Sequence, residues 1–341
     1  MKKIATIFMA LAMMMTTVFC FAACTPEASD KAKTYTVYAP DGAPALALAN
    51  AVDKSDDDCF EYHIVAASTI VAQVTGESPA ADFCILPVNA AASKLGTGEV
   101  YQMLGTVTNG NMYFLTTEGE TLTADNLEVL VGKKVGVVQL ANVPGLTFRA
   151  VLREKGIDYQ VLSGEVESSA DKVNLQPIQD AATGVTPAGG CDYYLCPEPV
   201  ASAKIKGTAS SAKPFRFAGS LQELYGEGNG YPQAVLVAKK SIIQSDLAAV
   251  NQLIGYMSDS AQFLAECEAT TVVSLLENCY TKGMTPSLNA NNLTSTVIAN
   301  CSVRFTAAQS CKEQVNTFLA KLIDVVPGFT SSVEDGFYYH A

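Results

Sequence analysis

The feature that most constrains the fold is a regular alternation of strand and helix patterns, which begins at residue 34 and starts again near residue 133. Short β-rich runs such as TYTVYA, EYHIVAA and ADFCILP are followed by segments with helical spacing of apolar residues. The second series contains KKVGVVQL, VPGLTFRAVLREKG, DKVNLQPI and CDYYLCP, and YPQAVLVAKK is a last clear strand. This order predicts parallel sheets covered by helices.

The second series repeats the first. VYAPDGAPAL aligns with VVQLANVPGL, so that Val37, Pro44 and Leu46 match Val137, Pro144 and Leu146. A second block, DFCILPVNAAASKL at Asp82, aligns with DYYLCPEPVASAKI at Asp192. Because the two blocks recur in the same order, the sequence predicts two lobes of similar build.

The tail from residue 240 to residue 329 has helical patterns without a counterpart in the second lobe. Apolar residues from Leu247 to Leu264 recur every three or four positions, and Asp246 suits the start of that helix. Thr306 and Gln309 form a capping-box pattern before another helix, which should stop near Pro327. We expect these helices to pack on the first lobe.

The chain of 341 residues therefore predicts an α/β protein with two lobes, each a mainly parallel sheet flanked by helices, with extra C-terminal helices on lobe one. Lobe one would comprise residues 34–110 and 232–341, and lobe two residues 111–231. The two crossings between them should lie near Asn109-Gly110-Asn111 and Gly230-Tyr231-Pro232, where glycines and turn formers can absorb backbone change.

The N-terminus predicts export and lipid anchoring. Residues 1–23 combine a basic start with an apolar stretch, as in a secretion signal. The string FAAC ends at Cys24 and resembles the bacterial lipoprotein processing box, which predicts acyl chains on Cys24; the alternative is a plain signal peptide. Residues 24–33 would form a polar tether. A net charge of −12 without a basic cluster argues against a nucleic-acid partner.

The remaining cysteines and the histidines predict neither a metal centre nor a catalytic set. There is no C-x-x-C and no zinc spacing, and His63 and His340 are the only histidines. Cys84 and Cys196 lie in apolar strand patterns and should be buried thiols. Cys301 with Cys311, or Cys267 with Cys279, could form disulfides. No nucleophile elbow or phosphate loop occurs, so we expect no enzyme activity, no cofactor and no metal.

Candidate ligand-binding residues follow the strands, because parallel α/β sheets bind ligands beyond the carboxyl ends of their strands. Pro144 suits a first helical turn, whose free N–H groups can hold an acceptor on a ligand. A local structural role is the alternative for each candidate, such as a turn at Asp41 or a helix cap at Asn89 or Asn142. The candidates are Tyr38, Asp41, Gly42, Ser68, Thr69, Asn89, Gln139, Asn142, Val143, Glu198 and Tyr231.

These segments together resemble the solute-binding lipoproteins of ABC importers. The leader with FAAC, the loop APDGAPALALA, the run GKKVGVVQLANVPGLTFRAVLREKGID, the segment CDYYLCPEPVASAK and the return YPQAVLVAKK carry the resemblance, over roughly residues 34–270. The branch is similar to binders of nitrate, sulfonate, taurine and thiamine-pyrimidine precursors. It implies a periplasmic-binding-protein-like fold of two lobes that closes over a small molecule. It also implies a lipid-anchored, extracytoplasmic monomer that delivers its ligand to a membrane permease driven by an ATPase.

The ligand prediction rests on charge. None of the four arginines, Arg149, Arg153, Arg216 and Arg304, lies on a predicted ligand loop. The acids Asp41 and Glu198 would suit a neutral or cationic heterocycle resembling a thiamine precursor, with tyrosines available for stacking. A sulfonate, taurine or nitrate ligand held by helix N-termini is the alternative. Two other classes stay open: an enzyme on this fold, similar to a menaquinone-pathway dehydratase, and a surface adhesion or sensor lipoprotein.

Overall fold

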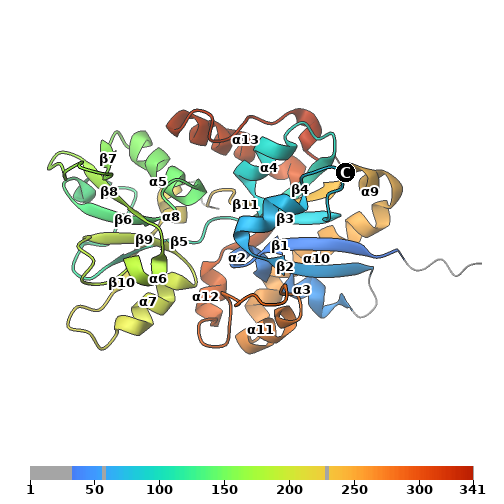
Figure 1. Ribbon diagram of the computed structural model, residues 1–341, viewed down its shortest axis with the longest axis horizontal. Coiled ribbons are helices and arrows are strands. Elements are labelled where there is room, and N and C mark those ends of the chain that lie inside the picture. The colour runs from blue at the N-terminus through green and yellow to red at the C-terminus, as the bar shows by residue number, and fades with distance from the viewer. Residues whose placement is uncertain (1–32, 56–58, 227–229, 341) are drawn as a thin grey trace, which may run out of the picture. The chain divides into compact units, whose positions relative to one another are not determined.

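The computed structural model describes residues 33–55, 59–226 and 230–340, and contains two six-stranded sheets (Figure 1). The predicted signal segment 1–23, the acylation site Cys24 and all but the last residue of the tether lie outside the described residues. Among the residues that are described, no helix is both long and apolar enough to cross a bilayer.

Sheet A has the strand order β12-β4-β11-β3-β1-β2. β1 lies between β2 and β3 and is parallel to both, whereas β11 runs antiparallel between β3 and β4, and β12 pairs antiparallel with β4. Its strands are β1 (Tyr35–Pro40), β2 (Phe60–Val65), β3 (Phe83–Pro87), β4 (Tyr101–Thr108), β11 (Ala234–Lys239) and β12 (Val303–Ala307).

Sheet B has the order β10-β5-β9-β6-β8-β7. β6 is parallel to β8 and β9, and β7 is parallel to β8, whereas β5 runs antiparallel to β9 and β10. The predicted class of two mainly parallel sheets is thus confirmed, with one long-range antiparallel strand inserted in each. The strands are β5 (Met112–Thr116), β6 (Lys134–Val138), β7 (Tyr159–Val161), β8 (Val173–Ile178), β9 (Tyr193–Pro197) and β10 (Arg216–Ser220).

Helices follow most of the parallel strands. The continuous helix expected over residues 43–52 is split in two, and the helix expected after β2 is a 3₁₀ helix. The helical elements are α2 (Ala43–Leu46), α3 (Ala49–Asp53), η2 (Ala67–Gln73), α4 (Val88–Leu95), η3 (Leu127–Leu130), α5 (Val143–Glu154), α6 (Ala181–Gly184), α7 (Val200–Thr208), α8 (Leu221–Tyr225), α9 (Lys240–Ser245), α10 (Leu247–Glu266), α11 (Ala269–Glu277), α12 (Ser295–Asn300), α13 (Ala308–Val325) and η4 (Asp335–Phe337).

The sequence repeat recurs as the same hydrogen-bonding motif in both sheets. Asp82, before β3, donates its N–H to the carbonyl of Thr36 and accepts the Thr36 N–H on Oδ2 (both 3.1 Å). Asp192, before β9, makes the same two contacts with Lys134 (both 2.8 Å). Thr36 therefore corresponds to Lys134 in the structure. Val37 then corresponds to Val135, two residues before the Val137 with which the sequence alignment pairs it. At the helix starts Pro44 does correspond to Pro144, because two extra residues lie in the loop after β6.

The chain crosses between the sheets twice, through connections that touch each other. The first crossing joins β4 to β5, and the second joins α8 to β11. Gly110 has φ +93°, and a Cβ there would lie 2.7 Å from the Tyr231 ring. Gly230 has φ +75°, and a Cβ there would lie 2.0 Å from the Asn109 carbonyl oxygen. Only glycine suits these two positions, because each combines a left-handed backbone with a close approach.

The C-terminal helices pack on sheet A as predicted, but the start of the last one differs. Asp246 accepts the Ala249 N–H (3.1 Å) and caps α10, in agreement with the sequence. The capping box at Thr306 and Gln309 is wrong. Thr306 belongs to β12 and pairs with Thr106 of β4, and α13 begins at Ala308 without a side-chain cap. The short strand was missed because five residues before a helix carry too little periodicity to be recognised.

Helix α13 also reaches beyond sheet A. Its residues Val315, Phe318, Leu319 and Leu322 are spaced for one helical face and are buried. Phe318 stacks on Tyr231 (centroids 5.5 Å) and packs edge-on against Tyr225 of α8 (5.8 Å). At its end, α13 contacts α5 through two ion pairs, Arg153–Asp324 (3.0 Å) and Lys321–Glu154 (2.9 Å). One hydrophobic core thus continues from sheet A through α13 to α5 and α8.

The eight cysteines from Cys59 to Cys311 are free thiols, so neither disulfide left open by the sequence forms. Cys84 and Cys196 are fully buried, as predicted. Burial raises the pKa of both thiols above the ordinary value, which keeps them neutral and unreactive.

Replacing Phe318 by alanine should lower the free energy of unfolding by about 3–5 kcal/mol, because the side chain is fully buried among aromatic rings. Phe217→Ala is the matched control, since Phe217 is 38% exposed. Chemical denaturation at 25 °C measures both. Equal losses for the two variants would contradict the role of α13 as a core element shared by both sheets.

Candidate functional site

The loop after β6 carries two predicted ligand-binding residues, Gln139 and Asn142, and borders a cavity of about 450 Å³. Gln139 is exposed and has φ 57°, a left-handed conformation that is uncommon for a residue other than glycine. Strain of this kind is often found at ligand-binding loops. Asn142 stands at the N-cap of α5 but makes no capping hydrogen bond, so its exposed side chain is not a helix cap. Both residues line the cavity together with Pro177 and Gln179 from the end of β8.

Arg149 is a site residue that the sequence did not reveal. It lies on α5 and not on a loop, yet its side chain lines the same cavity as Gln139 and Asn142. Its Nε donates to the Tyr159 hydroxyl (3.2 Å), and the guanidinium lies 5.4 Å from the centre of that ring. None of the arginines lies on a predicted ligand loop, as the sequence indicates, but Arg149 reaches this cavity from a helix. The signal was its position two helical turns after the loop, which returns the side chain towards the helix start.

In the first lobe, Asp41 is held by the tail of the chain. Its carboxylate accepts hydrogen bonds from the Tyr280 hydroxyl (3.0 Å), the Ser287 N–H (3.0 Å), the Ser287 hydroxyl (2.8 Å) and the Gly42 N–H (2.9 Å). Burial and then the Asp41 charge raise the pKa of Tyr280, so its hydroxyl stays a donor. In this conformation Asp41 fastens the segment 280–287 to the end of β1, and its contact with a ligand stays a prediction.

The other predicted residues of the first lobe, and Val143 of the second lobe, do not line the cavity at Gln139. Tyr38 of β1 is half-buried and stacks on His63 of β2 (centroids 4.7 Å), and burial raises its pKa. Ser68 and Thr69 are exposed on η2, where Thr69 donates to the Ala66 carbonyl (2.9 Å). Gly42 is the N-cap of α2, Val143 is the buried first residue of α5, and Asn89 lies inside α4 and is no cap.

Glu198 directly follows β9 and is almost fully buried (2% exposed). Its carboxylate accepts hydrogen bonds from the Ser202 N–H (3.0 Å), the Ser202 hydroxyl (2.7 Å) and the Asn300 side-chain amide (2.8 Å). Ser202 lies on the following helix, α7, whereas Asn300 lies at the end of α12. The acid is thus enclosed by the chain itself, and Asn300 is a partner that the sequence analysis missed.

Tyr231, in the second crossing, is completely buried between Tyr225 and Phe318. Burial raises its pKa well above the ordinary value. Its ring fills the core next to Gly110, so no part of it is exposed to a ligand in this conformation. The predicted stacking of this tyrosine on a ligand is untested, and its position suits a core role.

A cavity of about 650 Å³ beside the crossings is lined from both sheets. Its walls include Asn109 at the end of β4, Tyr113 of β5, Gln222 of α8 and Arg304 of β12. Burial is the main cause that raises the pKa of Tyr113. The Tyr113 hydroxyl donates to the Asn300 carbonyl (3.2 Å). The gap between the two sheet bodies therefore reaches this side of the crossings.

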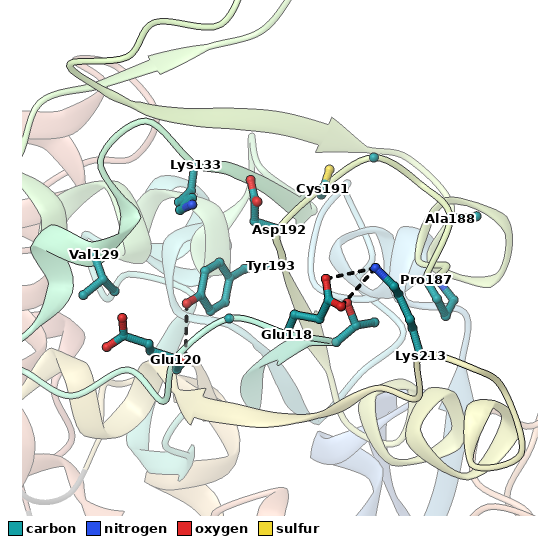
Figure 2. A pocket seen from close by; sticks show the side chains of 13 residues that line it. Glu118, Glu120, Val129, Lys133, Pro187, Ala188, Cys191, Asp192, Tyr193 and Lys213 are labelled. Carbon is teal, nitrogen blue, oxygen red and sulfur yellow. Dashed lines mark hydrogen bonds and ion pairs between the residues drawn. The ribbon is translucent and has the colours of Figure 1, made fainter.

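A further cavity of about 640 Å³ lies at the amino ends of β6 and β9 in sheet B, opposite to the strand ends that precede α5 and α7 (Figure 2). Lys213 pairs with Glu118 (3.0 Å), and the Tyr193 hydroxyl donates to the Glu120 carbonyl (3.2 Å). Its polar groups thus bind each other, and it lies at the strand ends that do not bind ligands in parallel α/β sheets. Across the described part of the chain, no group of three or more His, Cys, Asp or Glu side chains could hold a metal ion.

Three solved structures share this fold. An ABC transporter protein from Parabacteroides distasonis is 17% identical, with a TM-score of 0.64, over 90% of this chain and 99% of that chain. The aliphatic sulphonate binding protein SsuA from Escherichia coli is 14% identical (TM-score 0.56; 91% and 94%). The alkanesulfonate-binding protein SsuA from Xanthomonas axonopodis pv. citri, bound to MOPS, is 15% identical (TM-score 0.52; 89% and 97%). No protein-family model and no curated protein matches the sequence.

At these identities the likeness concerns the fold. The chain has the two-lobed α/β fold of the periplasmic binding components of ABC importers, and the resemblance predicted from the sequence is confirmed at that level. The first neighbour is described as an ABC transporter, and the other two are described as sulfonate-binding proteins.

Asp41→Ala should release the segment 280–287, because the Tyr280 hydroxyl and the Ser287 N–H lose their acceptor. We expect a loss of about 1–3 kcal/mol in the free energy of unfolding, together with faster amide hydrogen exchange over residues 280–294. Exposed Asp125→Ala is the control. Unchanged exchange in this segment would show that Asp41 does not anchor it.

Proposed function

We propose that this protein is the substrate-binding component of an ABC importer, which captures a small organic molecule and delivers it to a membrane permease with its ATPase. The observation that carries the proposal is the architecture. Two sheets with the same Asp82 and Asp192 motif are joined by two crossings that touch each other, and 90% of the chain matches the fold of an ABC transporter protein.

The architecture supports a closing mechanism. Helix starts follow β1 and β6 at the ligand-binding edge of each sheet, and each crossing contains a glycine in the left-handed conformation. A ligand that contacts both lobes stabilises the closed form, because only that form makes both sets of contacts. The lobes of this proposal are residues 34–110 with 232–341, and residues 111–231.

Two ligand classes have support, and the cavity at Gln139 favours an anion. Arg149 contributes a guanidinium there, and Asn142 at the N-cap of α5 contributes a side-chain amide. A sulfonate would suit these groups, and two of the structural neighbours are described as sulfonate binders. A heterocycle resembling a thiamine precursor would use Asp41 and Glu198. Such a heterocycle would have to replace the protein groups that already donate hydrogen bonds to both carboxylates.

The ligand should be found by a thermal-shift screen with alkanesulfonates, taurine, nitrate, pyrimidines and riboflavin. A ligand at one hundred times its Kd should add about 2.7 kcal/mol of apparent stability. If the ligand is an anion, Arg149→Ala and Asn142→Ala should abolish the shift, because both side chains line the cavity after β6.

The controls are Lys155→Ala and Asn251→Ala, which change an exposed basic residue at the far end of α5 and an exposed asparagine on α10. Both controls should keep the shift. If Arg149→Ala and Asn142→Ala also keep it, the ligand binds elsewhere. If no compound gives a shift, the ligand classes named here are wrong.

We also propose that the protein is extracytoplasmic and is anchored to the bacterial cell membrane by acyl chains on Cys24. Cys24→Ser should leave the protein in the aqueous phase of a detergent partition, whereas the unchanged protein should enter the detergent phase, since several acyl chains together anchor firmly. Cys20→Ser is the control within the same leader and should behave like the unchanged protein. A detergent-phase Cys24→Ser variant, or an N-terminal peptide without acyl mass, would contradict the anchor.

A further inference from the structure

The contact between Glu198 and Asn300 joins the bodies of the two sheets. Glu198 follows β9 of sheet B, and its carboxylate is held from the same side by Ser202 of α7. Asn300 ends α12, whose residues Val297 and Ile298 are buried in the core that covers sheet A. The 2.8 Å hydrogen bond from the Asn300 amide to Glu198 Oε1 therefore spans the gap between the two bodies.

A second hydrogen bond fixes the same residue. The hydroxyl of Tyr113, in β5 of sheet B, donates to the backbone carbonyl of Asn300 (3.2 Å). Asn300 thus donates one hydrogen bond to Glu198 through its side-chain amide and accepts one from Tyr113 through its backbone carbonyl. Burial raises the pKa of Tyr113, so the hydroxyl keeps its proton at neutral pH. The two bonds together define a specific docking position for the end of α12.

The chemistry of the contact suits a reversible closure. The three donors to the Glu198 carboxylate described above are all neutral. A hydrogen bond to a charged group is stronger than one between neutral groups, and a buried carboxylate that loses a donor is costly unless water replaces it. Opening the gap admits water to Glu198, which offsets most of that cost. The bond therefore favours closure without locking it.

We propose that Asn300 is a closure residue, whose side chain holds the two lobes together through Glu198. The importance of this closure for transport rests on the proposed function, whereas the contact and its test require no ligand. The C-terminal tail donates hydrogen bonds to an acid of each lobe: Ser287 donates to Asp41, and Asn300 donates to Glu198. The tail therefore favours the same closed form that a ligand would stabilise.

Single-molecule fluorescence energy transfer tests this in the ligand-free protein. Dyes attached through unnatural amino acids at exposed Ser211, after α7, and Ser274, on α11, report the distance between the lobes without modifying the native cysteines. Asn300→Ala should raise the ratio of open to closed molecules about tenfold or more, because a hydrogen bond to a charged group is lost. Asn300→Asp should raise it further, because it places a second carboxylate against Glu198.

Ser202→Ala is the matched control, since it removes a donor to the same carboxylate from within the same lobe. It should change the ratio less than about twofold. Tyr113→Phe removes the second hydrogen bond. It should raise the ratio of open to closed molecules by about threefold, which is less than the rise expected for Asn300→Ala. Circular dichroism establishes that each variant is folded. The inference is overturned if folded Asn300→Ala keeps the original ratio, or if Ser202→Ala opens the protein equally. Ligand shifts in the thermal screen, with or without this outcome, test the proposed function separately.

Discussion

The structure depends on the contact between its two crossings. Gly110 and Gly230 bring the connections so close that the Tyr231 ring and the Asn109 carbonyl occupy the space of a side chain at either position. The Tyr231 N–H donates to the Asn109 carbonyl (3.3 Å), and the Gln233 side chain donates to Asn111 (3.1 Å), so the crossings are also hydrogen-bonded to each other. A pair of joined crossings can act as one hinge, because rotation about either must carry the other with it.

Helix α13 limits what that hinge can do. It packs on β4 of sheet A, stacks Phe318 on Tyr231 of the second crossing, and forms two ion pairs with α5 beside sheet B. The pairs are partly exposed and contribute little, whereas the buried aromatic cluster contributes much more. In the proposed closing movement, an axis close to this cluster would disturb the buried core least. The contact between Asn300 and Glu198, away from that cluster, would then be the one that opens.

Much of this fold can be predicted from the sequence, because it rests on local patterns. Alternating apolar runs predict the parallel strands. The aspartates Asp82 and Asp192 can be aligned in the sequence, and in the structure they make the same hydrogen bonds. The strand β12 was missed because its stability comes from pairing with β4, nearly 200 positions earlier in the chain. Arg149 and Asn300 were missed for a related reason. Each sits on a helix, and its neighbours in space are set by how that helix packs, which no local pattern reports.

The same limit explains why counting charges on loops misjudges a ligand. Asp41 and Glu198 look available in the sequence, but the chain supplies neutral donors to both, four to Asp41 and three to Glu198. A ligand must exchange with those donors, and the gain is only the difference between two similar hydrogen bonds. The guanidinium of Arg149 is in a different situation, because its contact through Nε orients the group and leaves its planar geometry suited to two parallel bonds with an anion. Under the proposed function, the charge that a ligand must carry would thus depend on which charged groups the fold has already supplied with hydrogen-bond partners, more than on which charges the loops carry.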